Sequence, residues 1–237
     1  MDRNRSEKAT GDLMDLQSFL RFPLEDLPFI VLALIIAFTV HEFAHAYSAY
    51  KFGDDTAYNA GRVTLNPRVH LDVLGTLLIL IAGFGWAKPV PVNPSKFKSP
   101  RMMSIVVTAV GPLSNLLMGT ISIFIYVAIL ASDILSGASV GVDAAVHRFF
   151  DYFIWYNYLL FIFNLIPLPP LDGYRIIADL LPLKLRYKMD QNVQWGMFIF
   201  LLIVFIPPLR KVTLDPVLGL GADLMNNTFA WVYQIFL

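Results

Sequence analysis

The sequence contains no cysteine, so it can form neither a disulfide nor a thiolate metal site. Charged residues are also scarce, at 15% of the 237 residues against about 25% in an average soluble domain. Their charges sum to zero, and a chain without excess positive charge is not typical of nucleic-acid binding. We therefore predict no nucleic-acid partner, and the low charge argues against a conventional water-soluble enzyme.

Apolar residues make up 57% of the chain, and the mean hydropathy is +0.60. A membrane-spanning helix needs roughly 20 mostly apolar residues. The predicted spans are 28–49, 104–131, 149–171 and, less completely apolar, 192–209. The final segment, 216–237, contains one Asp and two Asn, so it is predicted either to span or to lie at the membrane interface.

The segment 72–94 differs because its apolar run, Val73 to Trp86, is too short to cross a bilayer and ends in Gly and Pro residues. Non-helical backbone at membrane depth is tolerated only where protein or water shields it. We therefore predict a re-entrant segment at 72–94. Just before it, residues 56–67 alternate weakly and are rich in turn formers, which predicts a small β-hairpin.

Residues 1–27 are predicted to form a polar tail and an interfacial helix, because apolar and charged residues alternate at helical spacing before the first span. No repeat or linker divides the rest of the sequence. We expect an all-α polytopic membrane protein, a helical bundle of about five to six spans. Residues 28–237 would form one membrane-embedded domain with its core at about 28–180.

His41, Glu42 and His45 form the pattern HExxH inside the first apolar segment. Four-residue spacing places both imidazoles on one face of a helix, where they can bind the same ion. Glu42 lies next to them and could accept a proton from water. Each ionisable group at the bilayer centre costs about 2.5–3.5 kcal/mol on insertion scales, so three within five residues favour a metal site over a chance match.

A catalytic zinc site usually has three protein ligands and one open position. Without cysteine, the third ligand must be His, Asp or Glu. Asp172, after a proline-rich run, is the better candidate. Taken without other evidence, it could equally be a turn residue that ends a helix and faces water. His70 remains a candidate, with a structural hydrogen-bonding role favoured, and His147 is interpreted as an exposed loop residue.

Two motifs together, HEFAH at 41–45 and NLIPLPPLDG at 164–173, resemble the site-2 protease family of intramembrane zinc metalloproteases. A third, GPxxN at 111–115, resembles the family's span between them. The resemblance covers about 28–180 and matches the minimal form, without PDZ or CBS domains. It implies a single Zn²⁺ per chain, with Asp172 as the third ligand beside the two histidines.

The resemblance also implies roles for further residues. Asn164 is expected to donate a hydrogen bond to the substrate backbone or the developing oxyanion, although an Asn within a bundle can equally bond a neighbouring helix. Asn115, Pro167 and Pro170 are expected to bind substrate. Glu42 would take a proton from water and pass it to the leaving amide nitrogen.

A shared metal ion restricts the topology. If Asp172 lies at the far end of the span that begins near 149, this span and the first must run in the same direction. Only 104–131 can then reverse the chain, so 72–94 must enter and leave on one side. Seven Lys or Arg lie in 51–101, four in 172–191 and none in 132–147. The positive-inside rule therefore places the site toward the cytoplasm.

The predicted function is hydrolysis of peptide bonds in or near transmembrane segments of membrane-anchored proteins. The resemblance implies anti-sigma-like regulators or signal-peptide remnants as substrates, and a multi-pass protein of a prokaryotic plasma membrane. The alternative is an ion- or proton-coupled transporter that uses buried His, Glu and Asp. A transporter predicts ionisable residues spread over several spans, whereas here they are concentrated at two motifs.

Overall fold

The computed structural model describes residues 22–82 and 85–236, and every regular element in these ranges is helical. The all-α prediction is therefore confirmed. The predicted β-hairpin is wrong: Thr56–Asn59 form the short helix α3, and Pro67–Val69 form the 3-10 turn η1. The reason is local, because the Asp54 carboxylate accepts hydrogen bonds from the backbone N–H (3.0 Å) and the hydroxyl of Thr56 and so starts a helical turn.

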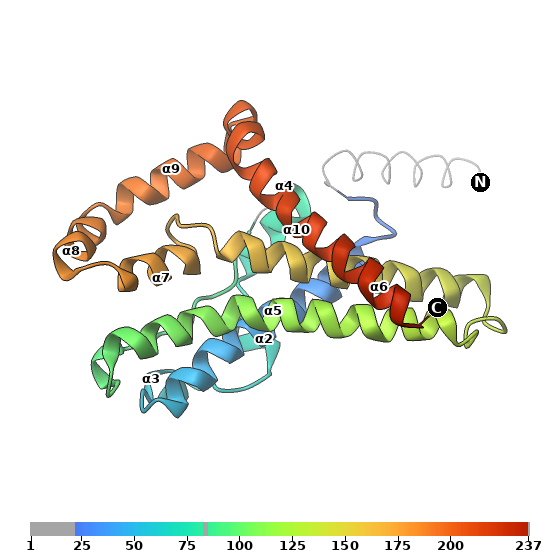
Figure 1. Cartoon of the computed structure of the whole chain (residues 1–237), viewed down its shortest axis with the longest axis horizontal. Helices are drawn as coiled ribbons and strands as arrows, with labels where there is room; N and C mark the ends of the chain where they lie inside the picture. The colour runs from blue at the N-terminus through green and yellow to red at the C-terminus, as the bar shows by residue number, and fades with distance from the viewer. Residues whose placement is uncertain (1–21, 83–84, 237) are drawn as a thin grey trace, which may run out of the picture.

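Three long helices form the centre of the molecule: α2 (Leu27–Lys51), α5 (Pro100–Ala131) and α6 (Val140–Asn164). Figure 1 shows α2 and α6 running in the same direction, with α5 returning between them. Parallel α2 and α6 are the arrangement expected if one metal ion is bound by the histidines of α2 and by Asp172, which follows α6. Apolar side chains of α2 and α6 meet in one core cluster, which includes Ile30, Leu34, Phe153 and Leu160.

The segment predicted to be re-entrant folds back on itself. It begins with α4 (Val73–Ala82), whose ten residues span about 15 Å, half of a bilayer's hydrocarbon core. From residue 85 the described backbone has no regular secondary structure as far as η2 (Pro94–Lys96). The Lys88 N–H donates to the His70 carbonyl at 2.8 Å, so the residues that follow the segment's turn lie beside those that precede α4.

The C-terminal part consists of shorter helices and one bent pair. The helices are α7 (Asp172–Leu180), α8 (Leu183–Gln191), α9 (Val193–Phe205) and α10 (Pro207–Phe236). The predicted span 192–209 is interrupted, since α9 and α10 meet at a bend of 97°. The residue before a proline is disfavoured in helical conformation, which explains why the helix stops at Phe205, before Pro207. Figure 1 shows α10 crossing over α6.

Two of the described helices, α2 and α5, are long and apolar enough to cross a membrane. The pair α9 and α10 adds a third if it forms one span. Length and composition thus do not confirm the predicted five to six spans: α4 is too short, and α6 interrupts its apolar residues with Asp143, Arg148 and Asp151. The predicted N-terminal tail and most of its interfacial helix lie outside the described residues.

Candidate metal centre

The structure brings His41, His45 and Asp172 together at one point. The two histidines lie one turn apart on α2, and their Nε2 atoms are 3.0 Å apart. Asp172 Oδ2 lies 3.2 Å from Nε2 of His41 and 3.3 Å from Nε2 of His45. Among the described residues, these three form a group of side chains whose ligand atoms are close enough to hold one metal ion.

Asp172 reaches this point from the first turn of a helix. The sequence suggested that Leu-Asp-Gly ends a helix, but α6 ends earlier, at Asn164, and Asp172 begins α7. Gly173 permits the tight connection, because a Cβ there would lie 2.2 Å from the carbonyl oxygen of Leu165. An acidic residue is also favoured at a helix N-terminus, where the backbone N–H groups leave a partial positive charge.

The hydrogen bonds of the two imidazoles define their tautomers. His41 Nδ1 lies 2.7 Å from Asn115 Oδ1, and His45 Nδ1 lies 2.7 Å from the carbonyl oxygen of Val107. Both oxygens are acceptors, so each ring carries its proton on Nδ1 and presents a lone pair at Nε2. The two Nε2 atoms thus face one another as acceptors, an arrangement that a cation between them would stabilise.

The third atom of the group also lacks a donor, since Asp172 Oδ2 is buried and has no hydrogen-bond partner among the described residues. Tetrahedral zinc with bonds of about 2.0–2.1 Å keeps its ligand atoms about 3.3 Å apart. The observed separations of 3.0–3.3 Å therefore fit a zinc ion. Two imidazoles and a carboxylate are also a donor set that suits zinc.

Helix α5 positions both histidines. A Cβ on Gly111 would lie 2.3 Å from Nε2 of His45, so only glycine allows α5 to pass this close. One turn later, Asn115 is fully buried and its amide is fully used. It accepts from His41 and donates to the Ala37 carbonyl (3.3 Å) and to Asn157 Oδ1 (3.0 Å).

Asn115 was predicted to bind substrate; in the structure it has no exposed surface, and its Nδ2 donates to the Ala37 carbonyl and to Asn157. Its Oδ1 contacts His41 Nδ1 and so holds this imidazole in place. Asn157, also fully buried, supports it from α6 and donates its own Nδ2 to the Phe153 carbonyl at 2.8 Å. Sequence analysis missed Asn157; an amide within an apolar helical run was the signal that could have found it.

Glu42 is buried beside the two histidines, and its carboxylate is held by the irregular segment 85–93. Oε2 accepts a hydrogen bond from the Val90 N–H at 3.0 Å. The same segment is fixed on either side of Val90: the buried Arg62 donates to the carbonyls of Lys88 and Pro89, and Asp54 accepts from the Asn93 N–H. The Glu42 carboxylate therefore has a defined orientation.

Comparison with known proteins assigns the chain to a family. The model of peptidase family M50 matches residues 131–206, which contain Asp172. A protein named "Putative zinc metalloprotease YwhC" from Bacillus subtilis (strain 168) is 48% identical over 221 residues, which are 92% of this chain and 99% of that protein. The chain belongs to peptidase family M50. The resemblance to site-2 proteases is thereby confirmed.

Two further relatives align over less of their own length. "Putative zinc metalloprotease Rip2" from Mycolicibacterium smegmatis is 26% identical over 190 residues, 77% of this chain and 68% of that protein. Rip2 from Mycobacterium tuberculosis (strain H37Rv) is 24% identical over 184 residues, 76% and 67% of the two chains. No solved structure matches the chain.

Three other residues, Asn164, Pro167 and Pro170, were predicted to belong to the site. Asn164 ends α6 and donates its Nδ2 to the Leu160 carbonyl at 2.9 Å, so this donor is engaged within its own helix. Pro167 and Pro170 lie exposed in the turn between α6 and α7. No hydrogen bond among the described residues links these three to the metal group.

The two remaining histidines do not join the metal group. His70 is fully buried and donates from Nε2 to the Thr64 carbonyl at 2.7 Å, the structural role that the sequence favoured. His147 is not the exposed loop residue expected. It lies within α6, bonds Tyr126 through Nδ1 at 2.5 Å and pairs with Asp143 at 3.4 Å, because α6 begins nine residues before the predicted span.

Proposed function

We propose that the chain is an intramembrane zinc metalloprotease that hydrolyses peptide bonds in or near the transmembrane segments of membrane-anchored proteins. One observation carries the proposal: in a member of family M50, two imidazole lone pairs and an unpartnered carboxylate oxygen converge beside a buried glutamate. We assign His41, His45 and Asp172 as the ligands of one zinc ion per chain. Membership of a peptidase family gives no support to the transporter alternative.

A zinc ion held by His41, His45 and Asp172 would supply a Lewis acid that makes water a competent nucleophile near neutral pH. Glu42 takes the proton of the attacking water and later delivers it to the leaving amide nitrogen. The Val90 N–H keeps its carboxylate turned away from the bulk solvent and next to the histidines. Water is scarce in such a buried site, which strengthens each electrostatic interaction.

One backbone acceptor and one side-chain acceptor keep the imidazoles ready to bind a metal ion. Val107 and Asn115 hold the Nδ1 protons, and the Nε2 lone pairs are therefore free for the ion. Partners of this kind, one layer behind the ligands, fix the tautomer and raise the basicity of the ligating nitrogen. Asn164 stays a predicted donor to the oxyanion, and that role requires its Nδ2 to leave the Leu160 carbonyl.

In the membrane, we propose that residues 28–237 form one domain in which α2, α5 and α6 cross the bilayer and 72–94 is re-entrant. The bond between Lys88 and His70 supports a segment that enters and leaves on one side. The excess of Lys and Arg in 51–101 and 172–191 supports a cytoplasmic location for those regions and for the site. Counting the re-entrant segment and the helices α9 and α10 as well, we propose a bundle of about five to six membrane-inserted segments.

The substrate must expose its backbone, because a helix hides its carbonyls in its own hydrogen bonds. Residues 85–93 form no helix, and Val90 among them bonds Glu42. This segment would pair with an unwound substrate as an added strand, with Pro167 and Pro170 shaping the opposite approach. Membrane-anchored anti-sigma-like regulators and signal-peptide remnants are the two proposed classes of substrate. Cleavage assays with one membrane-inserted substrate of each class separate them.

The test is a cleavage assay combined with metal analysis of the purified protein. Wild type should contain about one zinc per chain, a single-ion site of the catalytic type, and should cleave a co-expressed membrane substrate. Glu42→Gln should keep the zinc and lose cleavage, whereas Asp172→Ala should lose both. Persistent cleavage by Glu42→Gln removes Glu42 from the mechanism, and zinc binding without cleavage in wild type leaves a metal-binding protein that is not a protease.

A further inference from the structure

Helix α5 contacts the elements that carry all three proposed ligands. It reaches the two histidines directly, through the carbonyl of Val107 and the side chain of Asn115. It reaches the third ligand, Asp172, only through the helix that carries it. Helix α5 also packs against α7. Arg101, in the first turn of α5, makes the hydrogen bonds of this contact, at the end of α7 opposite to Asp172.

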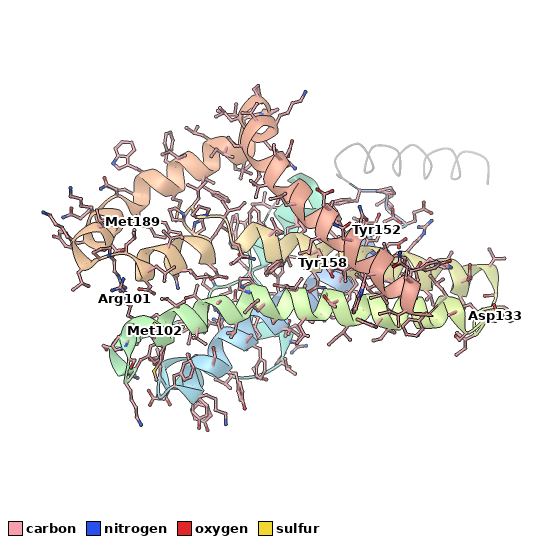
Figure 2. The ribbon with its side chains drawn as sticks, in the orientation of Figure 1. Arg101, Met102, Asp133, Tyr152, Tyr158 and Met189 are labelled. Carbon is pink, nitrogen blue, oxygen red and sulfur yellow. The ribbon has the colours of Figure 1, made fainter. Side chains whose placement is uncertain are left out.

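Arg101 binds three consecutive backbone carbonyls. Its Nε donates to Asp179, and its Nη2 donates to Leu180 and, at 2.7 Å, to Leu181. Figure 2 shows Arg101 between the start of α5 and the end of α7. The hydrogen bonds between α5 and the end of α7 that the structure describes all come from this one guanidinium.

The hydrogen bonds from Arg101 match the chemistry of both the guanidinium and the carbonyls at the end of α7. The last carbonyls of a helix have no partner within the helix, and together they carry a partial negative charge that attracts a cation. The planar guanidinium presents several N–H donors in a fixed fork, so it can hold three carbonyls in one arrangement, which an ammonium group cannot reproduce. Arg101 thus fixes both the position and the rotation of the end of α7 relative to α5.

The opposite end of α7 is fixed by steric contact. Gly173 lies so close to the preceding turn that a Cβ would meet the carbonyl oxygens of Leu165 and Ile166 at 2.2 and 2.7 Å. A nine-residue helix held at both ends moves as a rigid body. Because Asp172 is its first residue, the place of this carboxylate relative to His41 and His45 depends on both attachments.

We propose that Arg101 is a positioning residue for the third metal ligand. By clamping the end of α7 to the helix that orients both histidines, it aligns Asp172 Oδ2 with the two Nε2 atoms. This inference rests on the proposed function, because it requires that Asp172 be a ligand. Arg101 would thus act on the metal centre from the opposite end of α7, without contact with the ion.

The experiment measures Co²⁺ binding by the purified full chain, since Co²⁺ reports its ligands through visible absorption. Arg101→Met removes the donors but keeps an unbranched side chain. It should weaken Co²⁺ binding by about 10-fold, the lower limit for outer partners of metal ligands, and should alter the absorption band. Arg101→Lys should lie between this variant and wild type. Arg68→Met, at an exposed arginine of η1, is the matched control and should behave like wild type.

A second comparison separates positioning from general stabilisation. In an Asp172→Asn background, Arg101→Met should have little further effect on Co²⁺ affinity, because the ligand through which it acts is already impaired. The inference would be overturned if Arg101→Met weakened Co²⁺ binding as much in the Asp172→Asn background as in wild type. It would also be overturned if the folded Arg101 variants had the Co²⁺ affinity and the absorption spectrum of wild type. If Arg101→Met does not fold, Arg101→Lys in the two backgrounds carries the same comparison. Wild type that binds no Co²⁺ would instead overturn the proposed metal site itself.

Discussion

Gly111 of α5 and His45 of α2 are in contact at a distance that only glycine permits. A Cβ on Gly111 would lie 2.3 Å from both Cε1 and Nε2 of His45 and 2.9 Å from Cε1 of His41. Ordinary carbon contacts begin at about 3.5 Å. The missing side chain of Gly111 therefore leaves the space that is occupied by the imidazole of His45, whose Nε2 is a proposed metal-binding atom.

Gly111→Ala should therefore impair metal binding while leaving the helix intact. Alanine favours a helix over glycine by about 1 kcal/mol, so a loss of function cannot be due to helix propensity. The imidazoles would have to move, and we expect zinc affinity to fall by about 10- to 100-fold. Zinc content after dialysis against a graded chelator measures the change.

The matched control is Gly219→Ala in α10, where an added Cβ meets no atom within 4 Å. It should keep the zinc affinity of wild type. Equal zinc affinity for Gly111→Ala and wild type would show that α5 can move away from the histidines, contrary to the close contact described here.

Asn115→Ala should affect the metal centre through His41. The substitution leaves the Nδ1–H of a buried imidazole without an acceptor, and an unsatisfied buried group of this kind costs about 1–3 kcal/mol. The ring is then free to change its tautomer or to rotate, and zinc affinity should fall by about 10-fold or more. Isothermal titration with zinc measures the affinity, and Asn227→Ala, at an exposed position of α10, is the control.

Asn115→Asp distinguishes orientation of His41 from substrate binding. Aspartate keeps an acceptor for His41 but cannot donate to the Ala37 carbonyl or to Asn157. It should bind zinc better than Asn115→Ala does. If both variants bind zinc like wild type and only the KM of cleavage rises, Asn115 contacts substrate, and its assignment as a positioning residue is wrong.

Metal removal should destabilise the protein. Without a cation, the two Nε2 lone pairs and Asp172 Oδ2 face one another within 3.3 Å. A metal present at 1,000 times its Kd stabilises the folded state by roughly 4 kcal/mol, which for a chain of this size is about 10 °C in Tm. Thermal unfolding with zinc, with chelator and after zinc is restored should show this shift and its reversal.

Asp172→Asn supplies the control for that measurement. Its amide is a poor zinc ligand, so added zinc should raise its Tm much less than that of wild type. A zinc-dependent Tm that is the same in both proteins would place the ion elsewhere in the chain.

The parts of the structure that were predictable from the sequence are those with local causes. The apolar runs predicted α2 and α5 to within a few residues, because a helix that faces lipid or a buried core must be apolar over its length. The HExxH spacing predicted that His41 and His45 lie on one face of a helix, because residues four apart are neighbours on a helix surface. Asp172 came from its resemblance to a family motif.

The parts that were not predictable depend on contacts between distant residues. Asp54 turns residues 56–59 into a helix, and its other oxygen is held by the Asn93 N–H, 39 residues away. The clamp of Arg101 on the end of α7 joins residues about 80 apart. No local pattern indicates such pairings, because they exist only once the helices have packed together.

The orientation of the chain gives the last prediction, which the absence of cysteine makes simple to test, since each introduced thiol is the only one in the protein. Lys98, before α5, lies in a basic region that we place in the cytoplasm, and Ser136 lies in the connection between α5 and α6, which has no Lys or Arg. In intact cells, a membrane-impermeant maleimide should label Ser136→Cys but not Lys98→Cys. After the cells are lysed, both variants should be labelled, which controls for exposure of each thiol.

The same labelling tests whether α6 crosses the membrane. Lys184, in α8, follows the turn that carries Asp172, and it must lie on the side of Lys98 if α5 and α6 cross the membrane in opposite directions. We expect Lys184→Cys to be protected in intact cells like Lys98→Cys. Labelling of Lys184→Cys together with Ser136→Cys would mean that α6 does not cross, and the site could not then lie between spans that run in the same direction. Labelling of Lys98→Cys and Lys184→Cys alone would keep the bundle and reverse its orientation, so that the metal centre faces outward.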